Sequence, residues 1–176
     1  RKLMYISSFI NEWITENEKA GKKLAIGDIG CATGYFVNWA RRRGHKATGT
    51  ELTTNMRRFA EHFYGFPATK ELIPGKYDLI VMYHVLEHLV EPDKKLKKYV
   101  DMLNDDGRMM IACPEWYDIL EESGMPYKMS WPEYFHENHI NVFSFKMINN
   151  MFKKCGLKVL KVNRETYGQC FLLEKD

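Results

Sequence analysis

Residues 24–34, LAIGDIGCATG, are the most informative stretch of this chain. The stretch begins with a short apolar run, which is typical of a strand buried on both faces of a parallel sheet. Gly30 and Gly34 then permit a tight turn in which the backbone can approach a ligand closely. Residues 35–43 are predicted to form a helix, whose first N–H groups can bind a carboxylate or a phosphate. A strand, a glycine loop and a helix therefore form one predicted ligand-binding unit.

The sequence around this unit predicts alternating helices and strands. Helices are expected at residues 3–19, about 54–64, 92–103 and 143–154. Besides the strand at 24–29, strands are expected at residues 46–51, 66–72, 77–83, 108–113, 157–162 and 169–173. Strands that alternate with helices require parallel pairing and right-handed crossovers. The last two strands are separated only by a short polar loop, which predicts an antiparallel pair. The prediction is an α/β fold with a mostly parallel seven-stranded sheet and an antiparallel last strand.

Composition indicates one domain over residues 1–176, because 45% of the residues are hydrophobic and 14% are aromatic. A formal net charge of +3 is too small to favour nucleic acid as a partner, and the basic clusters are scattered along the sequence. The four cysteines form no C-x-x-C pair, which favours free thiols in a reducing compartment. No apolar run approaches the roughly 20 residues that span a bilayer. We therefore expect a cytoplasmic protein with no membrane span and no DNA partner.

Residues 114–142 fit no regular element and are rich in aromatic side chains. A long irregular stretch inside a compact domain is usually functional, so this segment is predicted to cover a substrate as a lid. The alternative is that these aromatic side chains belong to the core.

Glu51 ends the second predicted strand, about 20 positions after the glycine loop, where a carboxylate can accept both hydroxyl groups of a ribose. A nucleoside-bearing cofactor is therefore predicted. Residues 30–35, GCATGY, do not match the G-x-G-x-x-G pattern of nicotinamide dinucleotide sites. No G-K-[ST] follows either, which excludes a phosphate-binding P-loop.

Four ordered motifs resemble the class I S-adenosylmethionine-dependent methyltransferases, in particular the subgroup with D-h-G-C-G-x-G and hLEHh motifs. The matching segments are DIGCATG at 28–34, YDLIVMYHVLEHLVEP at 77–92, DDGRMMIACP at 105–114, and HINVFS with NNMFKKCGLKV within 139–159. The resemblance covers nearly the whole chain. It implies a Rossmann-like three-layer sandwich that transfers a methyl group from S-adenosylmethionine and releases S-adenosylhomocysteine. Two positions depart from the family pattern: Ala32 replaces the middle glycine, and Glu71 stands where an Asp would contact the adenine amine.

The resemblance also implies which residues contact the cofactor. The loop backbone would pass beneath the methionine portion, Glu51 would hold the ribose, and Leu52 would pack against the adenine. Glu71 would lie at the adenine rim, and Tyr83 and His84 would border the methionine portion. The full predicted cofactor-binding set is Asp28, Gly30, Cys31, Ala32, Gly34, Glu51, Leu52, Glu71, Tyr83 and His84.

Histidines carry the remaining chemistry. Residues 84–88, HVLEH, match the H-x-x-E-H motif of inverted zinc proteases, but that motif needs one helix and a third ligand downstream. Here the residues follow a buried strand and stop near Pro92, so a cofactor loop is favoured and no metal is predicted. His88 and His139 are the candidate catalytic residues, because an imidazole near neutral pH can remove a proton from the acceptor. Two alternatives for residues 136–139 are local hydrogen bonding and metal binding.

The sequence therefore predicts a methyltransferase that acts on an oxygen, nitrogen or carbon atom of a small molecule. The resemblance favours quinone-, sugar- or natural-product-like acceptors. The alternatives are an RNA or protein methyltransferase, and a module that binds a nucleoside without chemistry.

Overall fold

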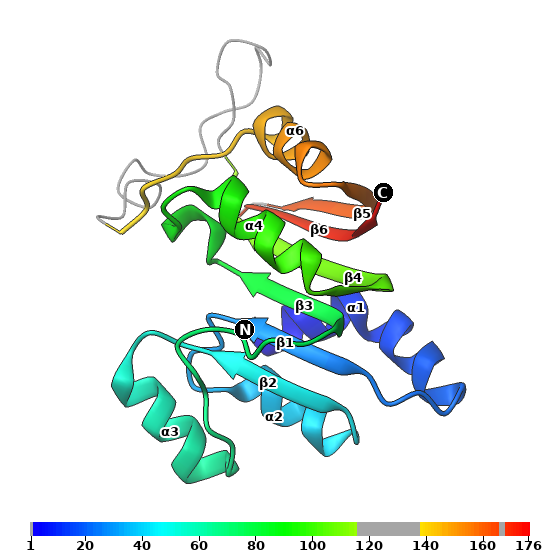
Figure 1. The fold of residues 1–176 in the computed structure, drawn as a ribbon, viewed down its shortest axis with the longest axis vertical. Helices are drawn as coiled ribbons and strands as arrows, with labels where there is room; N and C mark the ends of the chain where they lie inside the picture. The colour runs from blue at the N-terminus through cyan, green and yellow to red at the C-terminus, as the bar shows by residue number, and fades with distance from the viewer. Residues whose placement is uncertain (1, 116–137, 166–167) are drawn as a thin grey trace.

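The computed structural model describes residues 2–115, 138–165 and 168–176. Most of the predicted lid, together with His136 and Glu137, lies outside the described residues. The elements are α1 (Lys2–Lys19), β1 (Ala25–Ile29), α2 (Tyr35–Arg42), β2 (Lys46–Thr50), α3 (Thr54–Tyr64), β3 (Tyr77–Tyr83), the short 3-10 helix η1 (Leu86–His88), α4 (Pro92–Asp101), β4 (Leu103–Cys113), α6 (Phe145–Lys154), β5 (Leu157–Glu165) and β6 (Gly168–Lys175) (Figure 1).

One sheet runs through the molecule in the order β2-β1-β3-β4-β6-β5. β2, β1, β3 and β4 are mutually parallel, and β6 is antiparallel to both β4 and β5. This confirms the predicted α/β fold with an antiparallel last strand. The alternation of buried strands with helices is what imposes the parallel half, because a parallel pair needs a crossover connection.

The sheet has six strands, not the predicted seven, because residues 66–72 form no strand. Only Thr69 pairs with β2: its N–H donates to the carbonyl of Gly49, and its carbonyl accepts from the N–H of Glu51. Pro67 has no N–H to donate, so a ladder cannot extend through it. A single parallel bridge therefore takes the place of the expected strand.

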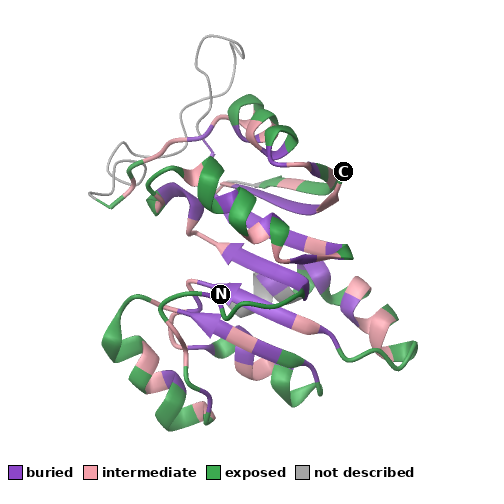
Figure 2. Cartoon of the chain, viewed as in Figure 1, coloured by how far each residue is buried: buried purple, intermediate pink, exposed green. Residues whose placement is uncertain are grey.

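Helices cover both faces of the sheet, which gives the predicted three layers (Figure 1). α1 and α2 pack with Ala60 of α3 on one face, in a buried cluster that includes Ile10 and Phe36. α4 and α6 pack on the other face, in a second cluster that includes Leu96 and Phe152. Figure 2 shows the strands between them as largely buried. Burial of these apolar side chains on both faces is the dominant stabilising term for such a sheet.

Several predicted boundaries differ from the observed ones. α4 ends at Asp101, two residues early, and β4 begins at Leu103. Residues 104–107, which separate the predicted helix from the predicted strand, form a bulge inside β4, since the pairing with β3 shifts between Leu103 and Arg108. α6 begins at Phe145 because the Ser144 hydroxyl accepts the N–H of Met147 at 3.3 Å and caps the helix.

All four cysteines are buried and form no disulfide, in agreement with the predicted thiols. Within the described part of the chain, no helix combines the length and the apolar character that crossing a bilayer requires.

Asp78, at the start of β3, makes the stability of the fold depend on pH. Burial alone raises the pKa of Asp78, but hydrogen bonds from the Ala25 N–H at 2.8 Å, the Asn104 amide at 2.9 Å and the Lys22 ammonium at 3.1 Å outweigh it and lower the pKa. The stabilisation is therefore fully present above the unfolded-state pKa of about 3.9, and it is lost as the pH falls through the lower folded-state pKa.

Asp78→Asn is accordingly expected to lower stability at neutral pH and to flatten the acid dependence of stability. Urea unfolding at a series of pH values between about 6 and 2 measures both effects. Asp105→Asn is the matched control, since the Asp105 side chain is fully exposed. If the free energy of unfolding of Asp78→Asn fell with decreasing pH as steeply as that of the unsubstituted chain, the acid dependence would come from other carboxyl groups.

Candidate active site

The candidate site lies at the carboxyl ends of β1, β2 and β3. β1 lies between β2 and β3, so the chain winds outward from β1 in two directions. Ile29 pairs with both Thr50 and Met82, which brings the loops after the three strands to one level. In open α/β sheets, ligands bind in the crevice that forms at such a switch point.

The glycine loop after β1 is held against the end of β2. The Cys31 N–H donates to the Thr50 carbonyl at 2.7 Å, and the Gly30 N–H lies 3.3 Å from the Thr50 hydroxyl. Gly30 and Gly34 have φ values of 67° and 83°, and Ala32 also has a positive φ, 51°. A residue other than glycine rarely adopts this left-handed conformation, and such outliers gather at ligand sites.

Glu51 contacts the glycine loop directly. One carboxylate oxygen, Oε2, accepts the Ala32 N–H at 3.1 Å, and Oε1 accepts the Thr53 N–H at 2.8 Å. The two backbone N–H groups hold the Glu51 carboxylate in place. The residue is only half-buried, so it still reaches solvent. The structure thus joins the two features on which a nucleoside site depends.

Arg57 of α3 is a further residue of this region that sequence reasoning missed. Its guanidinium donates to the carbonyl groups of Glu51 at 2.8 Å and Leu52 at 2.6 Å. These bonds hold the turn after β2 in place. In the sequence, Arg57 is one polar residue among many on an amphipathic helix, so no pattern singles it out.

Leu52 and Glu71 flank this turn. The Leu52 residue is 78% exposed, and such an apolar surface beside Glu51 suits the face of an adenine. Glu71 is exposed, and its carboxylate accepts the Lys98 ammonium of α4 at 3.1 Å, which lowers the pKa of Glu71. The contact of either residue with a cofactor stays a prediction.

Asp28 and Cys31 occupy the interior side of the site. Asp28 is buried within β1, between Gly49 of β2 and Val81 of β3. The Cys31 side chain is part of the core, because a Cβ placed on Gly49 would come within 2.6 Å of its sulfur. Neither side chain reaches the outer surface of the loop, which leaves the loop backbone to meet a ligand.

β3 ends in two aromatic residues that border the same crevice. Tyr83 is half-buried, and desolvation raises the pKa of its hydroxyl. His84 has a φ of 53°, donates its backbone N–H to the Ala112 carbonyl at 2.8 Å, and places Nδ1 3.0 Å from Oε1 of Glu87. The strained backbone of His84 turns the chain out of the sheet and into η1.

The structure brings together the two predicted catalytic histidines, which come from separate segments. The rings of His88 and His139 have their centroids 4.8 Å apart. The Glu87 carbonyl accepts the N–H groups of Ile140 and Asn141, each at 3.0 Å, and the Asn141 amide donates to the Leu89 carbonyl at 2.7 Å. This hydrogen-bonded clamp fixes the segment at 138–141 against η1.

Glu87 was missed as a site residue. It is 1% exposed, and its carboxylate lies between His84 and the histidine pair. The only signal for it in the sequence is the H-x-x-E-H match at residues 84–88, and a cofactor loop is favoured there because these residues follow a buried strand.

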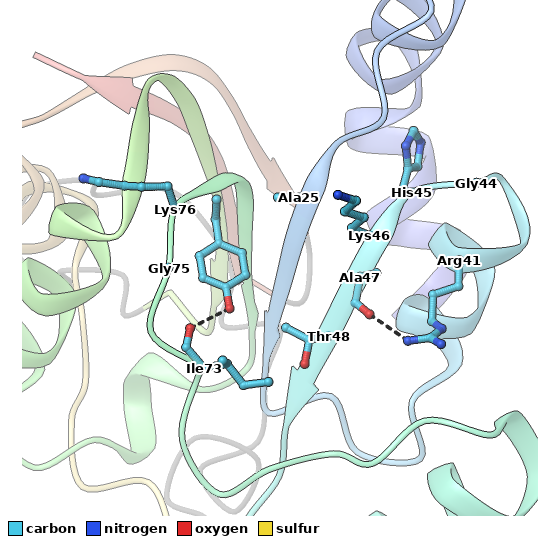
Figure 3. Close-up of a pocket in the computed structure, with 11 residues that line it drawn as sticks. Ala25, Arg41, Gly44, His45, Lys46, Ala47, Thr48, Ile73, Gly75 and Lys76 are labelled. Carbon is cyan, nitrogen blue, oxygen red and sulfur yellow. Dashed lines mark hydrogen bonds between the residues drawn. The ribbon is translucent and has the colours of Figure 1, made fainter.

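A hollow of about 560 Å³ lies at the opposite, amino ends of β1 and β2 (Figure 3). Three polar side chains of its lining already donate to backbone carbonyl groups: Arg41 to Ala47 at 3.3 Å, Lys76 to Asp101 at 2.9 Å, and Tyr77 to Ile73 at 2.7 Å. It is remote from the glycine loop, so it is not the candidate active site.

Known methyltransferases and methylases have a similar fold, although their sequences differ widely from this one. A methyltransferase from Mesorhizobium loti that depends on S-adenosylmethionine superposes with a TM-score of 0.70 at 15% identity, over 87% of this chain and 91% of that one. Magnesium protoporphyrin IX methyltransferase from Synechocystis, solved with bound S-adenosylhomocysteine, gives 0.68 at 14% identity, over 97% and 83%. A ribosomal protein methylase from Lactobacillus delbrueckii gives 0.61 at 16% identity, over 88% and 71%.

Identities this low establish the fold alone. No curated protein matches the chain. A family model described as a methyltransferase domain matches residues 5–162, and the chain therefore belongs to the methyltransferase-domain family, as its motifs predict.

Proposed function

We propose that this protein transfers a methyl group from S-adenosylmethionine to an oxygen, nitrogen or carbon atom of a small molecule. The observation that carries the proposal is the hydrogen bond between the Ala32 N–H and Glu51 Oε2 at the switch point of the sheet. Family membership supports methyl transfer, and a structural neighbour holds S-adenosylmethionine or its product.

The residues present fit this cofactor. Each carboxylate oxygen of Glu51 has more than one lone pair, so it can accept ribose hydroxyl groups while it keeps the N–H groups of Ala32 and Thr53. Leu52 offers an exposed apolar surface for the adenine, and the loop from Gly30 to Gly34 offers backbone to the methionine portion. The site therefore offers a hydrogen-bond acceptor for the ribose hydroxyl groups, an apolar surface for the adenine and backbone groups for the methionine portion.

The bound cofactor supplies a methyl group on a positively charged sulfur, which is an excellent leaving group. The chain has to align the acceptor and exclude water, and it needs few side chains for covalent work. Tyr83 and His84 border the place where the methyl group would lie. His88 and His139 face the acceptor side, where an imidazole can take up its proton.

The distribution of charge favours a small acceptor over RNA. Arg41–Arg43 end α2, Lys22 and Lys23 precede β1, and Lys153 and Lys154 end α6 before β5. β1, β2 and β5 run in the same direction, so these three clusters lie at the amino ends of the strands. The fourth basic cluster, Lys94–Lys98, lies on α4, which follows the carboxyl end of β3, but three of its lysines pair with the carboxylates of Glu91, Asp101 and Glu71. A nucleic-acid substrate would need positive charge at this side that is not already paired with carboxylates.

Glu51→Ala tests the proposal. Loss of a charged contact to both ribose hydroxyls is expected to weaken the binding of S-adenosylhomocysteine at least tenfold, as measured by isothermal titration calorimetry. Glu61→Ala is the matched control, because Glu61 is an exposed carboxylate on the nearby α3. Equal affinity of Glu51→Ala and the unsubstituted chain would remove Glu51 from the cofactor site, and a chain that binds no S-adenosylhomocysteine would refute the function itself.

A further inference from the structure

We propose that Glu87, His88 and His139 bind a divalent cation of the zinc type, and that this cation selects an oxygen atom as the methyl acceptor. The inference rests on the proposed function for its chemistry, but the cation site itself rests on three side chains. Each of the three offers one ligand atom, and these atoms all lie within 4.8 Å of one another.

The spacing is close to that of a filled site. Ligand atoms in a tetrahedral zinc site lie about 3.3 Å apart, given metal–nitrogen and metal–oxygen distances of about 2.0–2.1 Å. The widest pair here therefore needs to close by about 1.5 Å. His139 is half-buried, not fully enclosed, so a shift of its ring can contribute to this movement while His88 keeps its hydrogen bond to Asn138.

His88 has the protonation that a metal ligand requires. Its Nδ1 lies 2.7 Å from the backbone carbonyl oxygen of Asn138, and a carbonyl oxygen can only accept. Nδ1 therefore carries the proton, and in the neutral ring Nε2 presents its lone pair. Histidines that bind metals commonly donate their other ring N–H to a carbonyl or carboxylate in this way.

Glu87 supplies the second, independent observation. Glu87 is 1% exposed. Its Oε1 lies 3.0 Å from His84 Nδ1, whereas its Oε2 has no hydrogen-bond partner among the described residues. A buried carboxylate oxygen without a partner costs free energy, so a site of this kind needs a compensating charge or donor. A cation between Glu87 and the histidines removes that cost.

The clamp between η1 and residues 138–141 makes the arrangement a built site. Five hydrogen bonds join the two segments: His88 to Asn138, Ile140 and Asn141 to the Glu87 carbonyl, and the Asn141 amide to the carbonyl groups of Glu87 and Leu89. His139 is thereby held beside His88 although it comes from a distant part of the sequence. It joins Glu87 and His88 of the H-x-x-E-H residues, whereas His84 lies outside the proposed set.

The donor set indicates the kind of cation. Two imidazole nitrogens and one carboxylate oxygen suit zinc and neighbouring transition metals, whereas magnesium and calcium prefer oxygen ligands alone. Three protein ligands also leave a position open for water or for an oxygen of the acceptor.

An acceptor hydroxyl in the open position would lose its proton more easily, because the cation stabilises the resulting oxyanion. With the cation bound, His88 and His139 act as ligands and no longer as bases, so the proton leaves to solvent. The acceptor oxygen then forms a bond to the methyl carbon, and the carbon–sulfur bond breaks with its electron pair on sulfur. A positively charged donor and a hydroxyl thus become a neutral thioether, a methyl ether and one proton. An amine acceptor gains less from this site, since it needs a free lone pair more than a lowered pKa.

Metal-free full-length chain tests the site directly. Calorimetric titration with Zn²⁺ is expected to show one strong site, and Co²⁺ is expected to give the visible absorption bands of a four- or five-coordinate ion. His88→Ala and His139→Ala are each expected to weaken Zn²⁺ binding at least tenfold. His62→Ala is the control, since His62 is an exposed histidine on α3, and it should bind Zn²⁺ like the unsubstituted chain.

The oxygen preference has its own readout. Adding catechol to the Co²⁺-loaded chain is expected to shift the absorption bands as its oxygen enters the open position, and aniline is expected to leave them unchanged. Bands that respond to neither compound, or equally to both, would refute the selection of oxygen.

The outcomes separate this inference from the proposed function. Zn²⁺ binding that is weak in the unsubstituted chain, or unchanged in both His88→Ala and His139→Ala, overturns the cation site, even if S-adenosylhomocysteine binds normally. Conversely, strong Zn²⁺ binding in a chain that binds no S-adenosylhomocysteine would support the cation site and refute the proposed methyltransferase function. S-adenosylhomocysteine titrations of both histidine variants also report folding, because a correctly folded variant should retain the cofactor affinity.

Discussion

Gly34→Ala is expected to lower the free energy of unfolding by about 3 kcal/mol. Gly34 has a φ of 83° at the start of α2, a conformation that costs about 1 kcal/mol for alanine. The added Cβ would also lie 2.4 Å from the Phe66 ring and 3.2 Å from the Ala60 Cβ. Phe66 is fully buried, so its ring has little room to retreat, and the overlap adds a packing cost of about 2 kcal/mol.

Gly44→Ala separates the two contributions, because Gly44 has a φ of 89° but no atom within 4 Å of an added Cβ. It is expected to show the backbone cost alone, about 1 kcal/mol. Urea unfolding of both variants gives the difference. Equal losses for the two would mean that Phe66 yields freely and that packing behind the glycine loop is loose.

Arg164→Met is expected to destabilise the fold by about 3 kcal/mol. Arg164 of β5 makes a two-pronged ion pair with Glu115, with Nε–Oε2 at 2.9 Å and Nη2–Oε1 at 2.6 Å. Glu115 is 1% exposed, so removal of the guanidinium leaves a buried charge without this partner. Methionine keeps much of the apolar stem that packs near Phe145, which restricts the loss mainly to the charge.

Lys158→Met on the same strand is the matched control. Lys158 pairs with Glu174 at 3.6 Å on the surface, where an ion pair contributes at most about 1 kcal/mol. Adding Glu115→Gln to Arg164→Met should recover part of the loss in chemical unfolding, because the buried charge is then gone. A double variant no more stable than Arg164→Met would mean that the loss comes from the missing arginine stem.

The parallel half of the sheet was predictable because its strands are buried on both faces and read as apolar runs between helices. The stretch at 66–72 shows where this reasoning fails. Phe66 and Leu72 are both buried, as alternate residues of a strand would be, yet only Thr69 pairs with β2. Burial alone does not make a ladder, and the backbone pairing that decides it is not encoded in hydrophobicity.

The candidate site divides in the same way. Glu51 and the glycine loop were predictable because they lie at fixed offsets from two strands, so the fold itself places them together. The approach of His139 to Glu87 and His88 depends on hydrogen bonds between residues 138–141 and residues 87–89, and a main-chain carbonyl accepts every one of these bonds. A sequence pattern carries side-chain identities, and it gives no sign of a contact made by main-chain atoms far apart along the chain.

The carboxylate of Glu51 ties two loops together through backbone amides. Ala32 and Thr53 donate their N–H groups to this one side chain, not to a helix or a ladder. Their hydrogens can exchange with water only when the carboxylate releases them, so their exchange rates follow its local opening. These two amides thus report whether the nucleoside end of the crevice is rigid before a ligand arrives, and how far a ligand rigidifies it further.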